Sequence, residues 1–195
     1  MNIALFRNGL WIAIVVALAA ATLAFFLIRT PAGYQLGGGT YALVDDTGQP
    51  VGPNMFKGHP SLLFFGYTHC PDVCPTTLSE MAVWFHDLGG EAAKLRAFYV
   101  TVDPERDSQD IIHGYVTAFT DRITGVTGPR PEIDKIIAAW RVVAEKVPSS
   151  DGGYTMNHTA SVFLVDSLGS FVGTIAYGEE EKTALEKIRR LLKAS

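Results

Sequence analysis

Two cysteines with three residues between them are the side chains in this chain best suited to redox or metal chemistry. Cys70 and Cys74 are its only cysteines, and each is followed by a proline. A proline moves the residue before it out of helical geometry and itself suits the first position of a helix. We therefore expect a helix over about 75–88, with Cys74 at its N-cap and Cys70 in the preceding loop. The positive end of that helix favours thiolate over thiol, so both sulfurs would be placed to react.

Several kinds of chemistry are open to such a pair. The two thiols could form a static disulfide, although one bridge across so short a loop adds little stability. They could be a redox couple, or they could bind a metal ion together with other side chains. The candidates for such further ligands are His69, His158, Met55, Met81 and Met156, whereas His59, His86 and His113 are expected to be surface or packing residues.

The N-terminal part of the chain has the composition of a membrane anchor. Residues 10–28 carry no charge and are bracketed by Arg7 and Arg29. A helix of this length crosses a hydrocarbon core of roughly 30 Å. A cleaved signal peptide is the alternative, because residues 19–21 are all alanine. Signal h-regions are shorter, about 7–15 residues, so we expect an uncleaved transmembrane helix.

Charge suggests an orientation and excludes one class of partner. Arg7 and the terminal amine place residues 1–9 in the cytoplasm. A glycine-rich, flexible linker over 29–39 would follow the span. Residues 40–195 would then face the periplasm or the cell exterior, held at the cytoplasmic (inner) membrane by a single pass. Residues 30–195 hold all 20 acidic residues but only 14 of the 16 basic ones, because Arg7 and Arg29 precede them. The resulting charge of about −6 excludes nucleic acid, whose binding depends on neutralising phosphates.

Beyond the linker, strand-like and helix-like segments alternate. Residues 62–65 form a continuous apolar run, which is typical of a strand buried on both faces. The alternation predicts an α/β sheet with helices on both faces, and it puts the cysteine loop after a central strand, where open α/β sheets hold their sites. The expected strands are 41–44, 62–65, 95–102, 123–126, 161–165 and 171–175, and the expected helices are 75–88, 107–119, 132–140 and 180–192.

Three segments together resemble the signatures of the Sco/SenC family. They are Gly66–Pro75, Val102–Asp107 and Tyr154–Thr159. Members of this family are membrane-anchored, thioredoxin-like copper chaperones of cytochrome c oxidase assembly. The resemblance implies a thioredoxin-like fold with an N-terminal transmembrane helix, and it implies that Cys70, Cys74 and His158 hold one copper ion, as Cu(I) or Cu(II).

The donor set implied by the resemblance is chemically reasonable for copper. Two thiolates and one imidazole form a soft, three-coordinate set that suits Cu(I) and also accepts Cu(II). Structural zinc usually takes four protein ligands, and only His69 or Asp72 stands near the cysteines as a fourth. Asp103 could support the site without touching the metal. Met156 would share a strand face with His158, although packing is the commoner role for such a residue.

Two functions of different classes follow. A metallochaperone would hold copper through Cys70, Cys74 and His158 and pass it to the binuclear copper site of cytochrome c oxidase subunit II, or to another copper or thiol protein of the envelope. A thiol–disulfide oxidoreductase would instead use Cys70 and Cys74 as a redox pair that reduces the acceptor's cysteines before metallation. Redox pairs usually have two intervening residues, and a histidine ligand would be superfluous in them, so we favour the metallochaperone.

Overall fold

The computed structural model describes residues 11, 13–22, 36–149 and 152–194, and the chain divides into two units, 1–35 and 36–195. In the first unit, residues 11 and 13–22 are helical. The predicted tail over 1–9, and parts of the predicted span and linker, lie outside the described residues. Within the described part of the chain, no helix has both the length and the apolar character to cross a bilayer. The division of residues 1–39 into tail, span and linker therefore stays a prediction.

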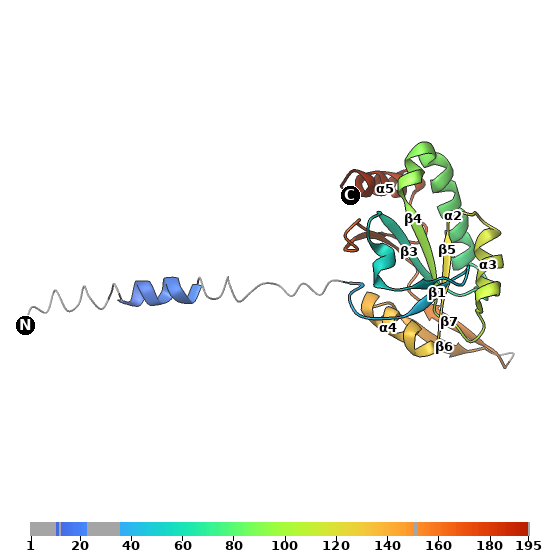
Figure 1. Ribbon diagram of the computed structural model, residues 1–195, viewed down its shortest axis with the longest axis horizontal. Helices are drawn as coiled ribbons and strands as arrows, with labels where there is room; N and C mark the ends of the chain where they lie inside the picture. Colours follow the sequence, from blue (N-terminus) through green and yellow to red (C-terminus); the bar gives the residue numbers. More distant parts are fainter. Residues whose placement is uncertain (1–10, 12, 23–35, 150–151, 195) are drawn as a thin grey trace, which may run out of the picture. The chain divides into compact units, whose positions relative to one another are not determined.

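A mixed sheet of seven strands forms the centre of the second unit (Figure 1). Its strands lie in the order β2-β1-β5-β4-β3-β8-β9. β3, β4 and β5 run parallel to one another, and the strands on either side of these three are antiparallel to their neighbours. The strands are β1 (Leu43–Asp45), β2 (Pro50–Val51), β3 (Ser61–Gly66), β4 (Arg96–Thr101), β5 (Thr124–Thr127), β8 (Val162–Val165) and β9 (Phe171–Ile175).

β3 is the strand that positions the cysteine loop, and all six of its residues are buried. It pairs with β4 on one side and with β8 on the other. This confirms that the apolar run 62–65 is a strand covered on both faces, which is what such a run indicates.

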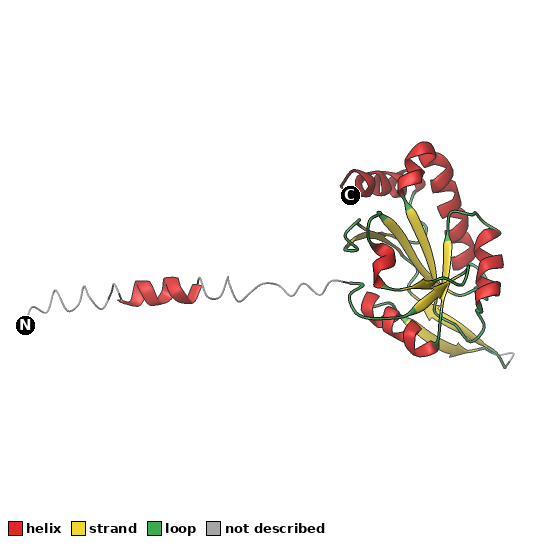
Figure 2. Cartoon of the chain, in the orientation of Figure 1, coloured by secondary structure: helices red, strands yellow, loops and turns green. Residues whose placement is uncertain are grey.

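Helices cover both faces of the sheet, as the alternation of elements predicts (Figure 2). α2 follows β3 and α3 follows β4, and successive right-handed crossovers place both helices on the same face. α5 packs against α2, whereas α4 lies between β5 and β6 in the chain. The helices are α2 (Val73–Leu88), α3 (Gln109–Thr117), α4 (Arg130–Trp140) and α5 (Glu181–Ala194), with two short 3-10 helices, η1 (Pro53–Phe56) and η2 (Gly89–Lys94).

Aromatic rings show that the core has two layers, one on each side of the sheet. On the α3 side, Tyr99 of β4 lies with its ring centroid 5.7 Å from that of Tyr115. On the α4 side, the ring of Phe163 lies 5.6 Å from that of Trp140 and 5.9 Å from that of Phe65. Because side chains alternate along a strand, neighbouring residues of β3 contribute to opposite layers.

A separate two-stranded sheet, β6 (Ala144–Pro148) paired with β7 (Tyr154–His158), stands apart from the seven-stranded one. The sequence predicts a shared strand face for Met156 and His158, but it does not predict the pairing of this strand with residues 144–148. His158 lies opposite Ala144 at the end of this hairpin. The histidine is therefore carried by an element that shares no strand pairing with the main sheet.

Element boundaries differ from the predicted ones by one to three residues. α4 begins at Arg130, not at Glu132, and α3 ends at Thr117. The N-cap of α3 is Ser108, whose hydroxyl accepts a hydrogen bond from the Ile111 N–H at 3.4 Å. Asp107, the first residue of the predicted helix, precedes this cap and is fully buried.

Candidate metal centre

The loop over residues 67–72 connects the end of β3 to the start of α2. α2 begins at Val73, so Cys74 lies inside its first turn and Asp72 is the N-cap residue. The prediction of Cys74 as the N-cap was wrong. The first N–H groups of any helix lack partners within the helix, so Pro75 is tolerated in the third position as well as in the first. Both sulfurs still lie at the positive end of the helix dipole.

The two cysteines are free thiols with different burial. Cys74 is fully buried, whereas Cys70 is partly exposed. The backbone N–H of Cys74 donates to Cys70 Sγ at 3.4 Å. Gly66 leaves room for the Cys74 sulfur, because a Cβ at this position would lie 2.7 Å from Cys74 Sγ and 2.9 Å from the Tyr99 ring.

His158 brings an imidazole to the same place from a position 84 residues later in the chain. Its Nε2 lies 3.4 Å from Cys74 Sγ, and its Nδ1 lies 3.1 Å from the carbonyl oxygen of Thr159. A carbonyl only accepts, so Nδ1 carries the hydrogen, and in the neutral ring Nε2 keeps the lone pair that a metal needs. The rings of Phe64 and Tyr67 stand edge-on to the imidazole and fix its orientation.

The donor atoms of Cys70, Cys74 and His158 all lie within 4.8 Å of one another. Among the described residues this is the one group of three or more His, Cys, Asp or Glu side chains arranged so closely. Cys70 and His158 open into a depression of about 220 Å³ that Tyr67 and Met156 also line. Two sulfurs and one nitrogen match the ligand preference of Cu(I) and Cu(II), and the missing fourth ligand argues against structural zinc.

The two thiols do not share their protons equally. The hydrogen bond from Cys74 lowers the pKa of Cys70 to about 3, burial opposes this, and His158 adds a further lowering. The same contact with Cys70, followed by burial, raises the pKa of Cys74. At neutral pH the pair therefore holds one thiolate, on the more exposed sulfur. A soft cation would meet a negative charge at the mouth of the depression.

Asp107 supports the cysteine loop through hydrogen bonds to Thr68, and the sequence analysis did not predict this role. Its carboxylate accepts from the Thr68 N–H at 3.1 Å, from the Thr68 hydroxyl and from the Thr101 hydroxyl at 2.6 Å. Burial is the main cause that raises the pKa of Asp107. An acid just before a helix reads as a cap, and no signal in the sequence points to Thr68.

Asp103 is the second buried acid of this segment, and its partners differ from those of Asp107. Its buried carboxylate accepts from Arg106 Nε and from the Tyr154 hydroxyl, the latter at 2.9 Å. Among the described residues, no hydrogen bond joins Asp103 to Cys70 or Cys74, and its link to the site runs through Tyr154 of the β6–β7 hairpin.

The remaining candidates take other places. His69 is half exposed, and its Nδ1 faces the Thr68 hydroxyl at 3.1 Å, away from the three-residue group. Met81 is buried in the core, and Met156 is buried where it lines the depression beside His158. Asp72 accepts from the Thr76 hydroxyl at the start of α2.

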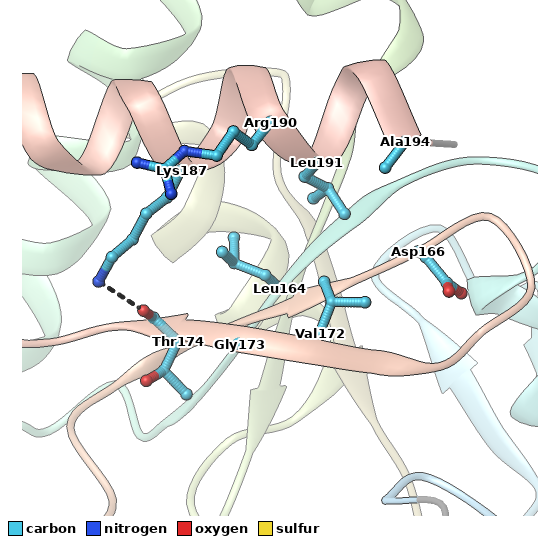
Figure 3. A pocket seen from close by; sticks show the side chains of 9 residues that line it. All are labelled: Leu164, Asp166, Val172, Gly173, Thr174, Lys187, Arg190, Leu191 and Ala194. Atoms are coloured by element: carbon cyan, nitrogen blue, oxygen red, sulfur yellow. Dashed lines mark hydrogen bonds between the residues drawn. The ribbon is translucent and has the colours of Figure 1, made fainter.

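The other histidines and a second depression offer no comparable site. His86 pairs with Asp87 and His113 with Asp46, both at the surface. A depression of about 390 Å³ lies between α5 and the β8–β9 hairpin (Figure 3). Its lining contains neither Cys nor His, and the ammonium of Lys187 there donates to the Thr174 carbonyl at 3.0 Å.

The fold and the site together define a thioredoxin-like α/β domain with a Cys–Cys–His group suited to copper. The sequence profile of the SCO1/SenC family matches residues 29–193. This match covers most of the chain, and the chain therefore belongs to the SCO1/SenC family.

Solved and curated relatives agree with this membership. Bradyrhizobium japonicum ScoI, solved with copper bound, is 42% identical, with a TM-score of 0.73 over 79% of this chain and 98% of that one. Yeast Sco1, also solved with copper bound, is 29% identical, with a TM-score of 0.74 over 81% and 89%. The mitochondrial SCO2 homolog of Danio rerio is 35% identical over 81% of this chain and 58% of its own length. This chain spans about half the length of the curated relatives that it matches.

Proposed function

We propose that this chain is a copper metallochaperone that binds one copper ion through Cys70, Cys74 and His158. The observation that carries the proposal is the approach of these three donor atoms to within 4.8 Å of one another. Copper bound in the structures of two relatives supports the same choice of metal. The thiolate of Cys70, the imidazole Nε2 of His158 and the buried sulfur of Cys74 would enclose the ion from three sides.

The same geometry suits transfer to an acceptor. Cys70 is the more exposed of the two sulfurs and lines the open depression. A thiolate of an acceptor could approach from this side and replace one ligand at a time, because the site has no fourth protein ligand to displace. By family membership the acceptor would be cytochrome c oxidase subunit II, at its binuclear copper site. The uncharged stretch 10–28 would hold donor and acceptor at one membrane surface and raise their effective concentration.

A metal-binding experiment on the reduced full chain tests the ligand set. We expect the wild type to hold one copper ion per chain and, as Cu(II), to show visible thiolate-to-copper absorption. His158→Ala should lose that absorption and weaken binding by more than the roughly 10- to 100-fold loss caused by removing a group that only supports a ligand. His69→Ala is the matched control, since His69 is half exposed and outside the donor group. Unchanged copper binding in His158→Ala would end the three-ligand proposal.

A thiol–disulfide oxidoreductase is the second candidate, and the low pKa of Cys70 favours it. A partly exposed thiolate beside a buried thiol is the arrangement that attacks a disulfide and then resolves the mixed intermediate. The reduction would consume the two thiols as electron donors and leave a Cys70–Cys74 disulfide. The two candidates can be separated by expressing variants in cells that lack the native protein. If the chain is an oxidoreductase, the His158→Ala variant should restore oxidase assembly and the Cys74→Ser variant should not. The metallochaperone needs both residues.

A further inference from the structure

His158 belongs to the β6–β7 hairpin, which has no strand pairing with the main sheet. β6 and β7 pair only with each other, and the hairpin is closed at the His158 end by bonds between its own residues. Val143 N–H donates to the Thr159 hydroxyl at 2.9 Å, and Thr159 N–H donates to the Val143 carbonyl at 3.1 Å. These bonds fix the hairpin internally, but they do not fix its distance from the cysteines.

Arg106 joins this hairpin to the segment that follows β4. Its Nε donates to the buried carboxylate of Asp103, and its Nη1 donates to the backbone carbonyl of Tyr154 at 3.1 Å. The guanidinium carbon also lies 3.8 Å from the centroid of the Tyr154 ring, and the Tyr154 hydroxyl donates to Asp103. Arg106 therefore holds Tyr154, the first residue of β7, in three ways. It bonds to the Tyr154 backbone carbonyl, stacks on the Tyr154 ring, and bonds to Asp103, which accepts from the Tyr154 hydroxyl.

The same guanidinium reaches the cysteine loop. Its carbon lies 5.7 Å from the centroid of the Tyr67 ring, and Tyr67 is the residue that follows β3 and opens that loop. Tyr67 in turn stands edge-on to His158, with ring centroids 5.7 Å apart. Arg106 thus contacts one residue from each of the two segments that supply the metal donors.

We infer that Arg106 is a positioning residue, which sets the distance of His158 from the two sulfurs by tying the β6–β7 hairpin to Asp103 and Tyr67. That Arg106 serves copper binding rests on the proposed function, whereas its tie between the hairpin and the cysteine loop rests on geometry alone. Removing the guanidinium would free the Tyr154 end of the hairpin, while β3 and α2 would keep the two cysteines in place. The imidazole would then leave the sulfurs for part of the time.

Hydrogen exchange of the metal-free full chain tests the mechanism without copper. We expect Arg106→Ala to raise amide exchange in β6 and β7 by roughly tenfold or more, with exchange in β3 and β4 unchanged. Arg106→Lys should give a smaller rise, because it keeps the charge facing Asp103 but lacks the planar fork and stacking face. Tyr154→Phe, which keeps the ring and loses only the hydroxyl bond to Asp103, should give the smallest effect.

The control is Arg122→Ala, which removes a comparable arginine with different contacts. Arg122 lies 5.3 Å from the centroid of the Phe85 ring and donates to the Ala92 carbonyl, without touching β6 or β7 in any described contact. Exchange in β6–β7 should stay as in the wild type for this variant. An equal rise in β3 and β4 for Arg106→Ala, or no rise in β6–β7, would overturn the inference.

Copper binding gives the second measurement and separates this inference from the proposed function. Arg106→Ala should weaken copper affinity by about 10- to 100-fold and reduce the visible absorption, with the Arg106→Lys variant between it and the wild type. Wild-type affinity in Arg106→Ala beside a clear loss in His158→Ala would overturn the positioning role and leave the copper proposal standing. If the wild type binds no copper, the proposed function fails, and the exchange data still decide the role of Arg106.

Discussion

Cys70 and Cys74 are the same residue type in one loop, yet their surroundings make them chemically unequal. Cys74 is buried against Gly66 and Tyr99, where a second negative charge would be costly. Cys70 is partly exposed, and it accepts from the Cys74 N–H at the N-terminus of α2. The first thiolate therefore belongs to Cys70, and its formation makes ionisation of Cys74 harder.

The inequality predicts a distinct pH dependence of alkylation in the reduced, metal-free full chain. The pKa of Cys70 is lowered to about 3, so its thiolate fraction is nearly constant from about pH 5 to pH 8. Its reaction with iodoacetamide should be almost independent of pH in this range, with Cys74 reacting far more slowly, as mass spectrometry of the digested chain would show. A rate at Cys70 that climbs about tenfold per pH unit up to pH 8 would mean an ordinary thiol.

The same pKa shift has a defined sign in folding stability. An unfolded cysteine has a pKa of about 8.5, so the unfolded chain binds more protons than the folded chain in the window between about pH 3 and that value. A lowered pKa gives a stabilising contribution that is fully present above the unfolded value and is lost as the pH falls toward the folded one. Cys70→Ser should remove this part of the pH dependence.

At the scale of elements, the cysteine loop is held by the segment between β4 and α3. Asp107 accepts two hydrogen bonds from Thr68 and one from Thr101, and it is fully buried. The raised pKa of Asp107 has burial as its first cause. The loop and this segment therefore form one hydrogen-bonded unit, although 39 residues of chain separate Thr68 from Asp107.

Asp107→Asn should loosen that unit. The amide offers one oxygen in place of two, and its NH₂ group faces hydroxyl and N–H donors, so we expect a loss of about 1–3 kcal/mol in the free energy of unfolding. Urea unfolding measures the loss, and hydrogen exchange should rise at the Thr68 amide. The matched variant is Asp110→Asn, because Asp110 is an exposed acid in the first turn of α3, and this variant should change neither quantity. Equal effects of the two variants would contradict the role given to Asp107.

Local signals in the sequence predict the elements that carry the cysteines but not those that carry the histidine. The apolar run 62–65 and the two prolines each act within a few residues, so β3 and the start of α2 follow from them to within two positions. β6, the strand that pairs with β7, is almost wholly exposed, so its residues show little alternation in burial. Hydrophobic periodicity therefore gives little indication of this strand.

Asp103 was predicted to support the site, but Arg106 and Asp107 were missed for a related physical reason. Asp103, Arg106 and Asp107 read as a capped helix start, because acids in a first turn have that role in most helices. Their actual partners, Thr68 and Tyr154, are far along the chain, and contacts of this kind arise only after the fold has formed. The grouping of Cys70, Cys74 and His158 was predicted from the resemblance of three short motifs to those of a known family. The spacing of these residues in the sequence did not predict it.

At the scale of the whole molecule, the metal site links two segments that otherwise meet through few bonds. Cys70 and Cys74 belong to the β3–α2 connection, and His158 belongs to a hairpin outside the main sheet. An ion held by all three would bridge 84 residues of chain, and such a bridge exists only in the folded state. Binding to the native state alone stabilises a protein by mass action.

Copper should therefore raise the unfolding temperature of the reduced full chain. At about a thousandfold excess over the dissociation constant, the native state gains roughly 4 kcal/mol, and each kcal/mol moves the midpoint by about 2–4 °C in a domain of 150–250 residues. We expect a rise of about 8–16 °C by calorimetry with Cu(I), the same rise in His69→Ala, and a much smaller rise in His158→Ala. Removal of copper by a chelator should return all three proteins to their metal-free midpoints. An equal rise in His158→Ala would mean that the cysteines alone hold the ion and that the hairpin carries no part of the site.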